Sequence, residues 1–424
     1  MKGLKLSLIV LTATLLAIGL SGMAYAFHSG GVAECGGCHS MHSPNPSGTF
    51  LLTQSDSSST CIECHSGPTR SSYHVFTYPL PGAGVPPVNF TPGGDFTYLL
   101  KDYKFTLRGT PTTELGQTHG HNVVAADFGL TVDTDFATSP GGTYPSSNLA
   151  CASCHDPHGK YRRIGGDTNY TIATAGAPII GSGSYNTSLT PTASQAVGVY
   201  RLLAGQGYQR AGAPPYPGVP AASAPSTYNQ DEATNQVRVA YGHAPTGGGR
   251  TTWGEWCATC HAKMHSNGNY VHPVDETLGS TIAGIYNKYI NSSNTVGGAA
   301  ATSYLSLVPF VENTADYAVL KSHASNTNKY LNGPASSDRV SCLSCHRAHA
   351  SGFPDALRWQ MEGEFITVAD AGGNPIWPGT DNGASTSFSR GRTELEMRAA
   401  YYNRPATVFG AYQRVLCNKC HAQD

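Results

Sequence analysis

The chain has 424 residues, a formal net charge of −1, and only 12% charged residues. It contains no runs of Lys or Arg, which argues against nucleic-acid binding and against strong steering toward an acidic surface. The 49 glycines and 27 prolines predict a turn-rich chain with few long helices and a limited side-chain core. The abundance of Tyr, Ser, Thr and Gly suits a chain that packs against copies of itself, and equally a loop-rich monomer.

Residues 1–26 have the three parts of a secretory signal peptide. Two lysines lie within the first five residues, an apolar run covers 6–20, and Ala24-Tyr25-Ala26 is a small-x-small cleavage site. The alternative is a membrane anchor, but the run is shorter than the ~20 apolar residues that span a bilayer. We therefore expect cleavage before Phe27, export, and a mature chain without a transmembrane segment.

Six C-x-x-C-H boxes follow, and together they use all twelve cysteines. The two thiols of such a box can form thioether bonds to a haem, and the histidine then ligates the iron on the proximal side. The boxes are Cys35/Cys38/His39 (box 1), Cys61/Cys64/His65 (box 2), Cys151/Cys154/His155 (box 3), Cys257/Cys260/His261 (box 4), Cys342/Cys345/His346 (box 5) and Cys417/Cys420/His421 (box 6). The pattern predicts six covalent haem c groups.

Three other uses of these cysteines are weaker interpretations. A redox dithiol or half of a zinc site also uses C-x-x-C, but neither requires a histidine directly after every second cysteine. A disulfide within C-x-x-C closes too short a loop to be an effective staple. Because turns and haems replace a large core, the predicted fold is mostly irregular and loop-rich. We expect short helices and a few short strands wrapped around a chain of haems.

The boxes alternate in type and form three pairs. The first box of each pair continues as C-x-x-C-H-x-x-H, which adds His42, His158 and His349, and a further histidine precedes it: His28, His121 or His323. Residues 27–424 are therefore predicted to form one hexahaem domain of three haem-pair modules, near 27–65, 121–261 and 323–421. No phosphate loop, dinucleotide fingerprint or H-E-x-x-H zinc motif occurs.

Few spacers show a clear pattern. Residues 95–108 alternate well enough for a strand or hairpin arm, and 165–249 are composed like long loops. Apolar residues at helical spacing predict a helix within 275–290. Short helices are expected at 314–323, capped by Thr314, at 393–403, and before Cys417.

The second axial ligands decide whether the irons carry electrons or react with small molecules. Eleven histidines lie outside the boxes, and six of them occupy repeated positions. These six, predicted as the distal ligands, are His28, His42, His121, His158, His323 and His349. The histidine three residues after a box cannot reach its own iron across the porphyrin, so it must serve a neighbouring haem.

Other assignments stay open at this point. The six histidines could instead lie behind the iron ligands or face solvent, and Met or Lys could be distal ligands. The remaining histidines are interpreted as structural or propionate-binding, although any of them could replace one of the six: His74, His119, His243, His265 and His272. His265 follows His261 by four residues, which places both on one face of a helix.

Four stretches carry a resemblance to a known family. They are 27–35 (Phe-His-Ser-Gly-Gly-Val-Ala-Glu-Cys), 154–163, 342–353 and 416–422. In these the chain resembles the filament-forming, outer-surface hexahaem cytochromes of metal-reducing bacteria, and the similarity thins in the long spacers. His119 and His243 have no evident counterpart in that family.

The resemblance implies a head-to-tail homopolymer with a continuous haem chain and two histidine ligands on every iron. It also implies that His42 ligates the box 5 haem of the adjacent subunit. The expected function is extracellular electron transfer, without enzymatic chemistry, through a surface filament that serves partner cytochromes and acceptors such as metal oxides. Two alternatives remain, a monomeric periplasmic or outer-surface shuttle and a multihaem reductase of a small oxyanion.

Overall fold

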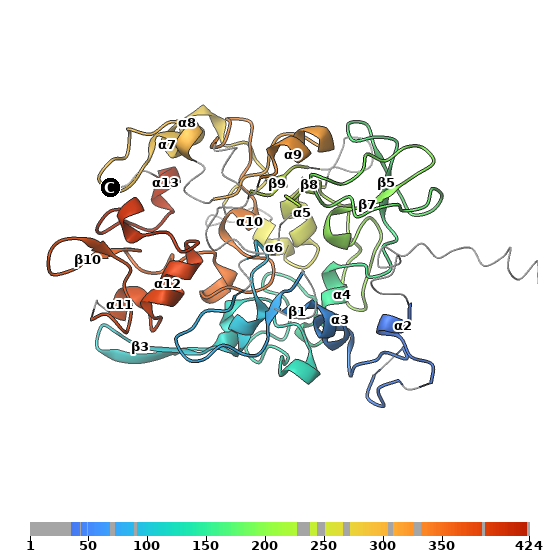
Figure 1. Cartoon of the computed structure of the whole chain (residues 1–424), viewed down its shortest axis with the longest axis horizontal. Coiled ribbons are helices and arrows are strands. Elements are labelled where there is room, and N and C mark those ends of the chain that lie inside the picture. The colour runs from blue at the N-terminus through green and yellow to red at the C-terminus, as the bar shows by residue number, and fades with distance from the viewer. Residues whose placement is uncertain are drawn as a thin grey trace, which may run out of the picture.

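The computed structural model describes residues 35–42, 44–48, 50–67, 73–88, 91–226, 238–243, 251–265, 272–303, 308–325, 332–383 and 386–421. Within them the chain is mostly loop, with short helices and two- or three-stranded sheets (Figure 1). The predicted fold class is therefore confirmed. None of the helices in these ranges is both long and apolar enough to cross a membrane.

Each box is built on a helical turn, which brings its two cysteines, three residues apart, to one face. The helices of boxes 1 to 6 are α2 (Cys35–Cys38), α3 (Ser57–His65), α4 (Cys151–Cys154), α5 (Trp253–Ala258), α10 (Cys342–Cys345) and α13 (Asn418–His421). In box 3, the N–H of His155 donates to the carbonyl of Cys151 at 3.0 Å. The same bond recurs in boxes 1, 4, 5 and 6, at 2.8–3.2 Å.

The other helices are short. They are α6 (Ala262–His265), α7 (Gly279–Lys288), α8 (Ala300–Ser303), α9 (Tyr317–His323), α11 (Thr386–Ser389) and α12 (Glu394–Ala400), with 3-10 turns η1 (Phe96–Leu100), η2 (Gly116–His119), η3 (Ala126–Phe128), η4 (Ser146–Asn148), η5 (Tyr200–Leu202), η7 (Pro354–Ala356) and η8 (Ala406–Val408). The element α7 lies inside the predicted helix at 275–290. Helix α12 begins after Thr393, whose side chain and that of Glu396 form a reciprocal capping box.

The strands form small, separate sheets. They are β1 (Ser66–Gly67), β2 (Phe76–Thr77), β3 (Tyr103–Leu107), β4 (Thr110–Glu114), β5 (Arg162–Ile164), β6 (Thr171–Ala173), β7 (Val197–Gly198), β8 (Ala222–Ser223), β9 (Ala240–Tyr241), β10 (Val368–Ala369) and β11 (Pro375–Ile376). The longest pairing is the antiparallel hairpin β3–β4, in which Tyr103 faces Glu114. Strands β6, β5 and β7 form the three-stranded sheet.

Three local predictions need correction. Residues 95–108 were expected to form a strand or hairpin arm, but only their second half does. The first half forms the turn η1, because the Asp95 carboxylate accepts a hydrogen bond from the N–H of Thr97 and caps that turn. The N-cap of α9 is Asp316 rather than Thr314, since its carboxylate accepts the first free N–H groups of the helix. Before Cys417 the chain forms only the turn η8 and loop, and the terminal helix α13 begins after that cysteine.

The side-chain core is larger than the composition suggests and is divided into separate aromatic clusters. One cluster gathers Tyr200, Tyr241 and Trp253 beside the box 4 helix, and another gathers Trp359, Trp377 and Tyr401 near boxes 5 and 6. Each cluster packs around a different part of the chain rather than forming one central core. The boxes are therefore held in place locally.

Candidate haem-binding sites

The six boxes follow one another in space in the same order as in the sequence. Along the long axis of the molecule, α2 lies toward one end, the contacting helices α3 and α4 come next at about the same level, then α5 and α10, and α13 lies toward the other end (Figure 1). The thiol of Cys151 raises the pKa of Cys61, and the thiol of Cys342 raises the pKa of Cys257, so the thiols of each pair lie next to each other. Electrostatic coupling between cysteines links the remaining neighbours, namely Cys38 with Cys64, Cys154 with Cys260, and Cys345 with Cys417. Each box therefore adjoins the next one.

The box histidines are oriented by the main chain. In five boxes Nδ1 donates to a backbone carbonyl, the pairs being His39 with Phe50 (2.9 Å), His65 with Tyr73 (2.6 Å), His155 with Arg201 (2.7 Å), His261 with Pro140 (2.9 Å) and His346 with Asp355 (2.6 Å). A carbonyl can only accept, so the proton lies on Nδ1. The lone pair of Nε2 is thereby reserved for a metal ion, which is how ligating histidines are usually held.

Four box histidines face a second histidine ring. The ring centroids are 6.5 Å apart for His39–His158, 6.3 Å for His155–His349, 5.9 Å for His121–His261 and 6.4 Å for His272–His421. When two imidazoles bind the same metal ion from opposite sides, each at about 2 Å, their ring centroids are roughly 6 Å apart. The spacing therefore fits a single iron between the rings of each pair.

Two of the facing histidines are deeply buried. Burial, reinforced by the nearby His155, lowers the pKa of His349 to about 3, and burial with His261 lowers that of His121 to about 4. Both rings are therefore neutral at physiological pH, the form that binds a metal. Nδ1 of His121 donates to the carbonyl of Ala348 at 2.9 Å, and the ring of His349 stacks on Phe96 at 4.7 Å.

The other predicted distal ligands differ in their surroundings. His28 lies outside the described residues. His42 is exposed on the segment that follows α2, next to the exposed Met41. Nδ1 of His323 lies 2.6 Å from a carboxylate oxygen of Glu312. The structure thus places His272, and not His323, opposite the histidine of box 6.

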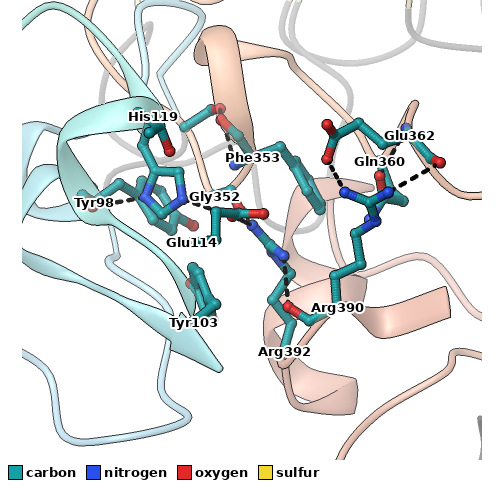
Figure 2. A network of polar contacts seen from close by, with 12 residues as sticks. Tyr98, Tyr103, Glu114, His119, Gly352, Phe353, Gln360, Glu362, Arg390 and Arg392 are labelled. Carbon is teal, nitrogen blue, oxygen red and sulfur yellow. Dashed lines mark hydrogen bonds and ion pairs between the residues drawn. The ribbon is translucent and has the colours of Figure 1, made fainter. Parts of the chain in front are cut away.

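Two further histidines have both a structural role and a polar partner. His119 is fully buried, with Nδ1 3.0 Å from the carbonyl of Tyr98 and Nε2 2.7 Å from Glu114 (Figure 2). Nε2 of His265 lies 3.0 Å from a carboxylate oxygen of Asp275. These contacts agree with the interpretation of both residues as structural. His74 packs against Gly67, and the N–H of His243 donates to the carbonyl of Thr314.

The residues present fit haem c better than another metal group. Paired thiols on one helical face, a neighbouring histidine with Nε2 available, and a second histidine across a gap of one metal ion are the donors that haem c needs. In the described part of the chain, no group of three or more His, Cys, Asp and Glu side chains forms a cage for a bare metal ion.

Comparisons with known proteins agree with this geometry. No family model matches the chain. It is 48% identical over 451 aligned positions, covering all of both chains, to the C-type cytochrome OmcS of Geobacter sulfurreducens. The chain belongs to the OmcS family of c-type cytochromes. The resemblance noted from the sequence is thus confirmed, and with it the presence of covalently bound haem c.

Two cryo-EM structures of OmcS filaments from Geobacter sulfurreducens are similar to this OmcS-family chain. Both have a TM-score of 0.84, and both cover 94% of this chain and 100% of the solved chain. The identities are 48% for the OmcS nanowire structure and 47% for the outer membrane cytochrome S filament structure. The fold of a filament-forming cytochrome is therefore shared over almost the whole chain.

His272 faces a box histidine, although sequence reasoning did not select it as a distal ligand. It lies between boxes 4 and 5, as His323 also does, so chain order alone did not separate the two. Only the long-range packing that brings residue 272 to box 6 distinguishes them.

Proposed function

We propose that this OmcS-family cytochrome binds six haem c groups and polymerises into an extracellular filament that conducts electrons to external acceptors. The observation that carries the proposal is the row of boxes in chain order, with four box histidines facing a second histidine at single-iron spacing. Haem supplies the reversible one-electron chemistry of iron. The chain aligns the groups, saturates both axial positions, and so favours electron transfer over bond-making at the iron.

The histidine that follows an odd-numbered box serves the odd-numbered box before it. His349, after box 5, faces His155 of box 3, and His158, after box 3, faces His39 of box 1. His42 follows box 1, and its own chain has no odd-numbered box before box 1. By this rule His42 therefore ligates a haem of another subunit. The matching partner is His346 of box 5 in the adjacent subunit, the same pairing that the family resemblance implies.

The second rule concerns the histidine that precedes an odd-numbered box. His121 precedes box 3 and faces His261 of box 4, and His272 precedes box 5 and faces His421 of box 6. By the same rule His28, before box 1, ligates the iron of box 2. The proposed distal set is thus His28, His42, His121, His158, His272 and His349, with His272 in place of His323.

The surroundings of His42 support a ligand that crosses between subunits. Met41 is 79% exposed and Phe50 is 81% exposed, so the segment around His42 presents apolar side chains to the outside. No histidine of the described residues faces His346 at single-iron spacing. Boxes 1 and 6 lie toward opposite ends of the molecule, so a repeated contact of this kind does not close into a ring and generates a filament (Figure 1).

The cellular setting follows from the same proposal. Residues 1–26 are removed on export, and residues 27–424 act as one unit of three haem-pair modules at the cell surface. Partner cytochromes deliver electrons, and solid acceptors such as metal oxides receive them at the filament. No specific observation favours a monomeric shuttle. None favours a reductase either, which needs an iron with an open axial position.

Replacing His42 tests the proposal directly. In His42→Ala, the box 5 iron loses its second ligand and the junction between subunits weakens, so we expect few or short filaments by negative-stain microscopy and one high-spin haem by magnetic circular dichroism. Met41→Ala is the matched control for ligand loss, because it trims an adjacent exposed side chain of the same segment and leaves every ligand intact, so all its haems are expected to stay low-spin. Wild-type filament length with all haems low-spin in His42→Ala would contradict the assignment.

A further inference from the structure

Arg358 is held against the box 5 turn by two hydrogen bonds to the main chain. Its backbone N–H donates to the carbonyl of Cys345 at 2.8 Å, and its side-chain Nε donates to the carbonyl of Leu343 at 2.7 Å. The side chain is only 3% exposed. The guanidinium is within electrostatic range of Cys345 and of His346, the axial ligand of this box. Its position relative to the box is therefore fixed.

The far nitrogen of this guanidinium has no acceptor among the described residues. Nη2 of Arg358 is buried and makes no hydrogen bond. A buried charge without a counter-ion is strongly unfavourable, so folded proteins pair such groups or neutralise them. Two other buried arginines obey this rule, since Arg163 lies 3.3 Å from Asp167 and Arg392 is bonded to Glu114. Arg358 forms no ion pair with an acidic side chain of the described residues, and its Nη2 stays without an acceptor beside the box 5 turn.

The next two residues repeat the pattern. The indole Nε1 of Trp359 and the amide Nε2 of Gln360 are buried donors without an acceptor, and both residues are fully buried. Three consecutive residues directly beside box 5 thus present donors that no described protein atom satisfies. Buried donors in native proteins nearly always have a partner, so this segment lacks an acceptor that the loaded protein supplies.

We propose that Arg358 binds a propionate group of the haem attached to box 5. This inference rests on the proposed function, which places a haem on Cys342 and Cys345. A haem propionate is an anion that the box itself does not neutralise, and a guanidinium binds a carboxylate through two parallel hydrogen bonds. Arg358 is therefore a positioning residue, which orients the haem and balances its charge.

The proposed contact also affects the reduction potential of the box 5 haem, and with it the energy of one electron-transfer step in the haem chain. A positive charge beside a haem stabilises its reduced form, because reduction adds a negative charge. Removing that charge leaves the propionate uncompensated and makes the potential of this haem more negative. Box 5 is also the box that receives His42 of the adjacent subunit in the proposed filament, so Arg358 tunes the haem at the junction.

Two measurements test the proposal. A cryo-EM map of the haem-loaded wild-type protein is expected to show the Arg358 guanidinium at about 2.7–2.9 Å from a propionate oxygen of the box 5 haem. A map in which this haem is present but its propionates contact other groups overturns the inference. A map without haem on Cys342 and Cys345 would instead overturn the proposed function, so the two failures are distinguishable.

Spectroelectrochemical titration of variants gives the second readout. In Arg358→Gln one haem is expected to titrate at a more negative potential than in the wild type, and Arg358→Lys, which keeps the charge, is expected to restore it. Arg414→Gln is the matched control. It also removes a positive charge close to a box, three residues before Cys417, but this charge is half-exposed and already paired with Glu364. Superposable titrations of Arg358→Gln and wild type would refute the role. If Arg358→Gln does not fold, the wild-type map decides.

Discussion

The assignment of His272 to box 6 makes the sharpest prediction, because His272 and His323 both lie between boxes 4 and 5 and only the packing of the chain separates them. Substitution of His272 by Ala removes the ring that lies 6.4 Å from His421 and leaves the box 6 iron with one protein ligand. One haem of six is therefore expected to change from low-spin to high-spin. In His323→Ala, a carboxylate-bonded ring is lost and all haems are expected to stay low-spin.

The assay is electron paramagnetic resonance with the ultraviolet–visible spectrum of the oxidised, haem-loaded protein. The high-spin signal is compared with the total haem content from pyridine haemochrome analysis. About one sixth of the haem in the high-spin state for His272→Ala, with none for His323→Ala, is the predicted pattern. The reverse pattern, with His323→Ala high-spin and His272→Ala unchanged, would refute the reasoning.

Three further predictions concern stability and loading. Glu114→Gln leaves the buried guanidinium of Arg392 without its counter-ion (Figure 2). We therefore expect the free energy of unfolding, measured by denaturant titration, to fall by about 3–5 kcal/mol. A loss below about 1 kcal/mol would contradict a stabilising role of the buried pair. Burial alone would raise the pKa of Glu114, but His119 and Arg392 hold this pKa below its usual value. The ionised Glu114 therefore stabilises the fold above its unfolded pKa of about 4.3. That stability is lost as the pH falls through the lower pKa of the folded state. A melting temperature that stays constant from pH 6 to pH 3 would argue against this linkage, and Glu114→Gln should flatten the pH dependence. Cys151→Ala with Cys154→Ala should remove one haem in the haemochrome assay and lower the melting temperature, whereas an unchanged haem count would disprove attachment at box 3.

The boxes and most of the fold class could be predicted because they depend on short-range patterns. A helical turn carries each pair of cysteines, so the spacing alone indicates the attachment sites and the side on which the histidine lies. The scarcity of charge and the abundance of Gly and Pro indicate a loop-rich chain. Helix α7 was also evident from the apolar periodicity of 275–290, and the short helix expected at 393–403 is α12.

The distal pairings could not be predicted because they depend on contacts between distant segments. His121 meets His261 across 140 residues of chain, and His155 meets His349 across 194. The same limit explains the cap of α9, where Thr314 and Asp316 are both good N-cap residues and the local backbone path decides between them. Sequence alone likewise gave no indication of the buried donors at Arg358–Gln360.

The identity of the ligand opposite His346 in the assembled protein tests the central claim most directly. A cryo-EM map of filaments purified from the haem-loaded wild-type chain is predicted to show Nε2 of His42 from one subunit on the box 5 iron of the next. The box 5 and box 1 haems would then continue one conducting chain across the junction. A box 5 iron ligated by a histidine of its own chain, or a preparation that contains only monomers, would contradict the account.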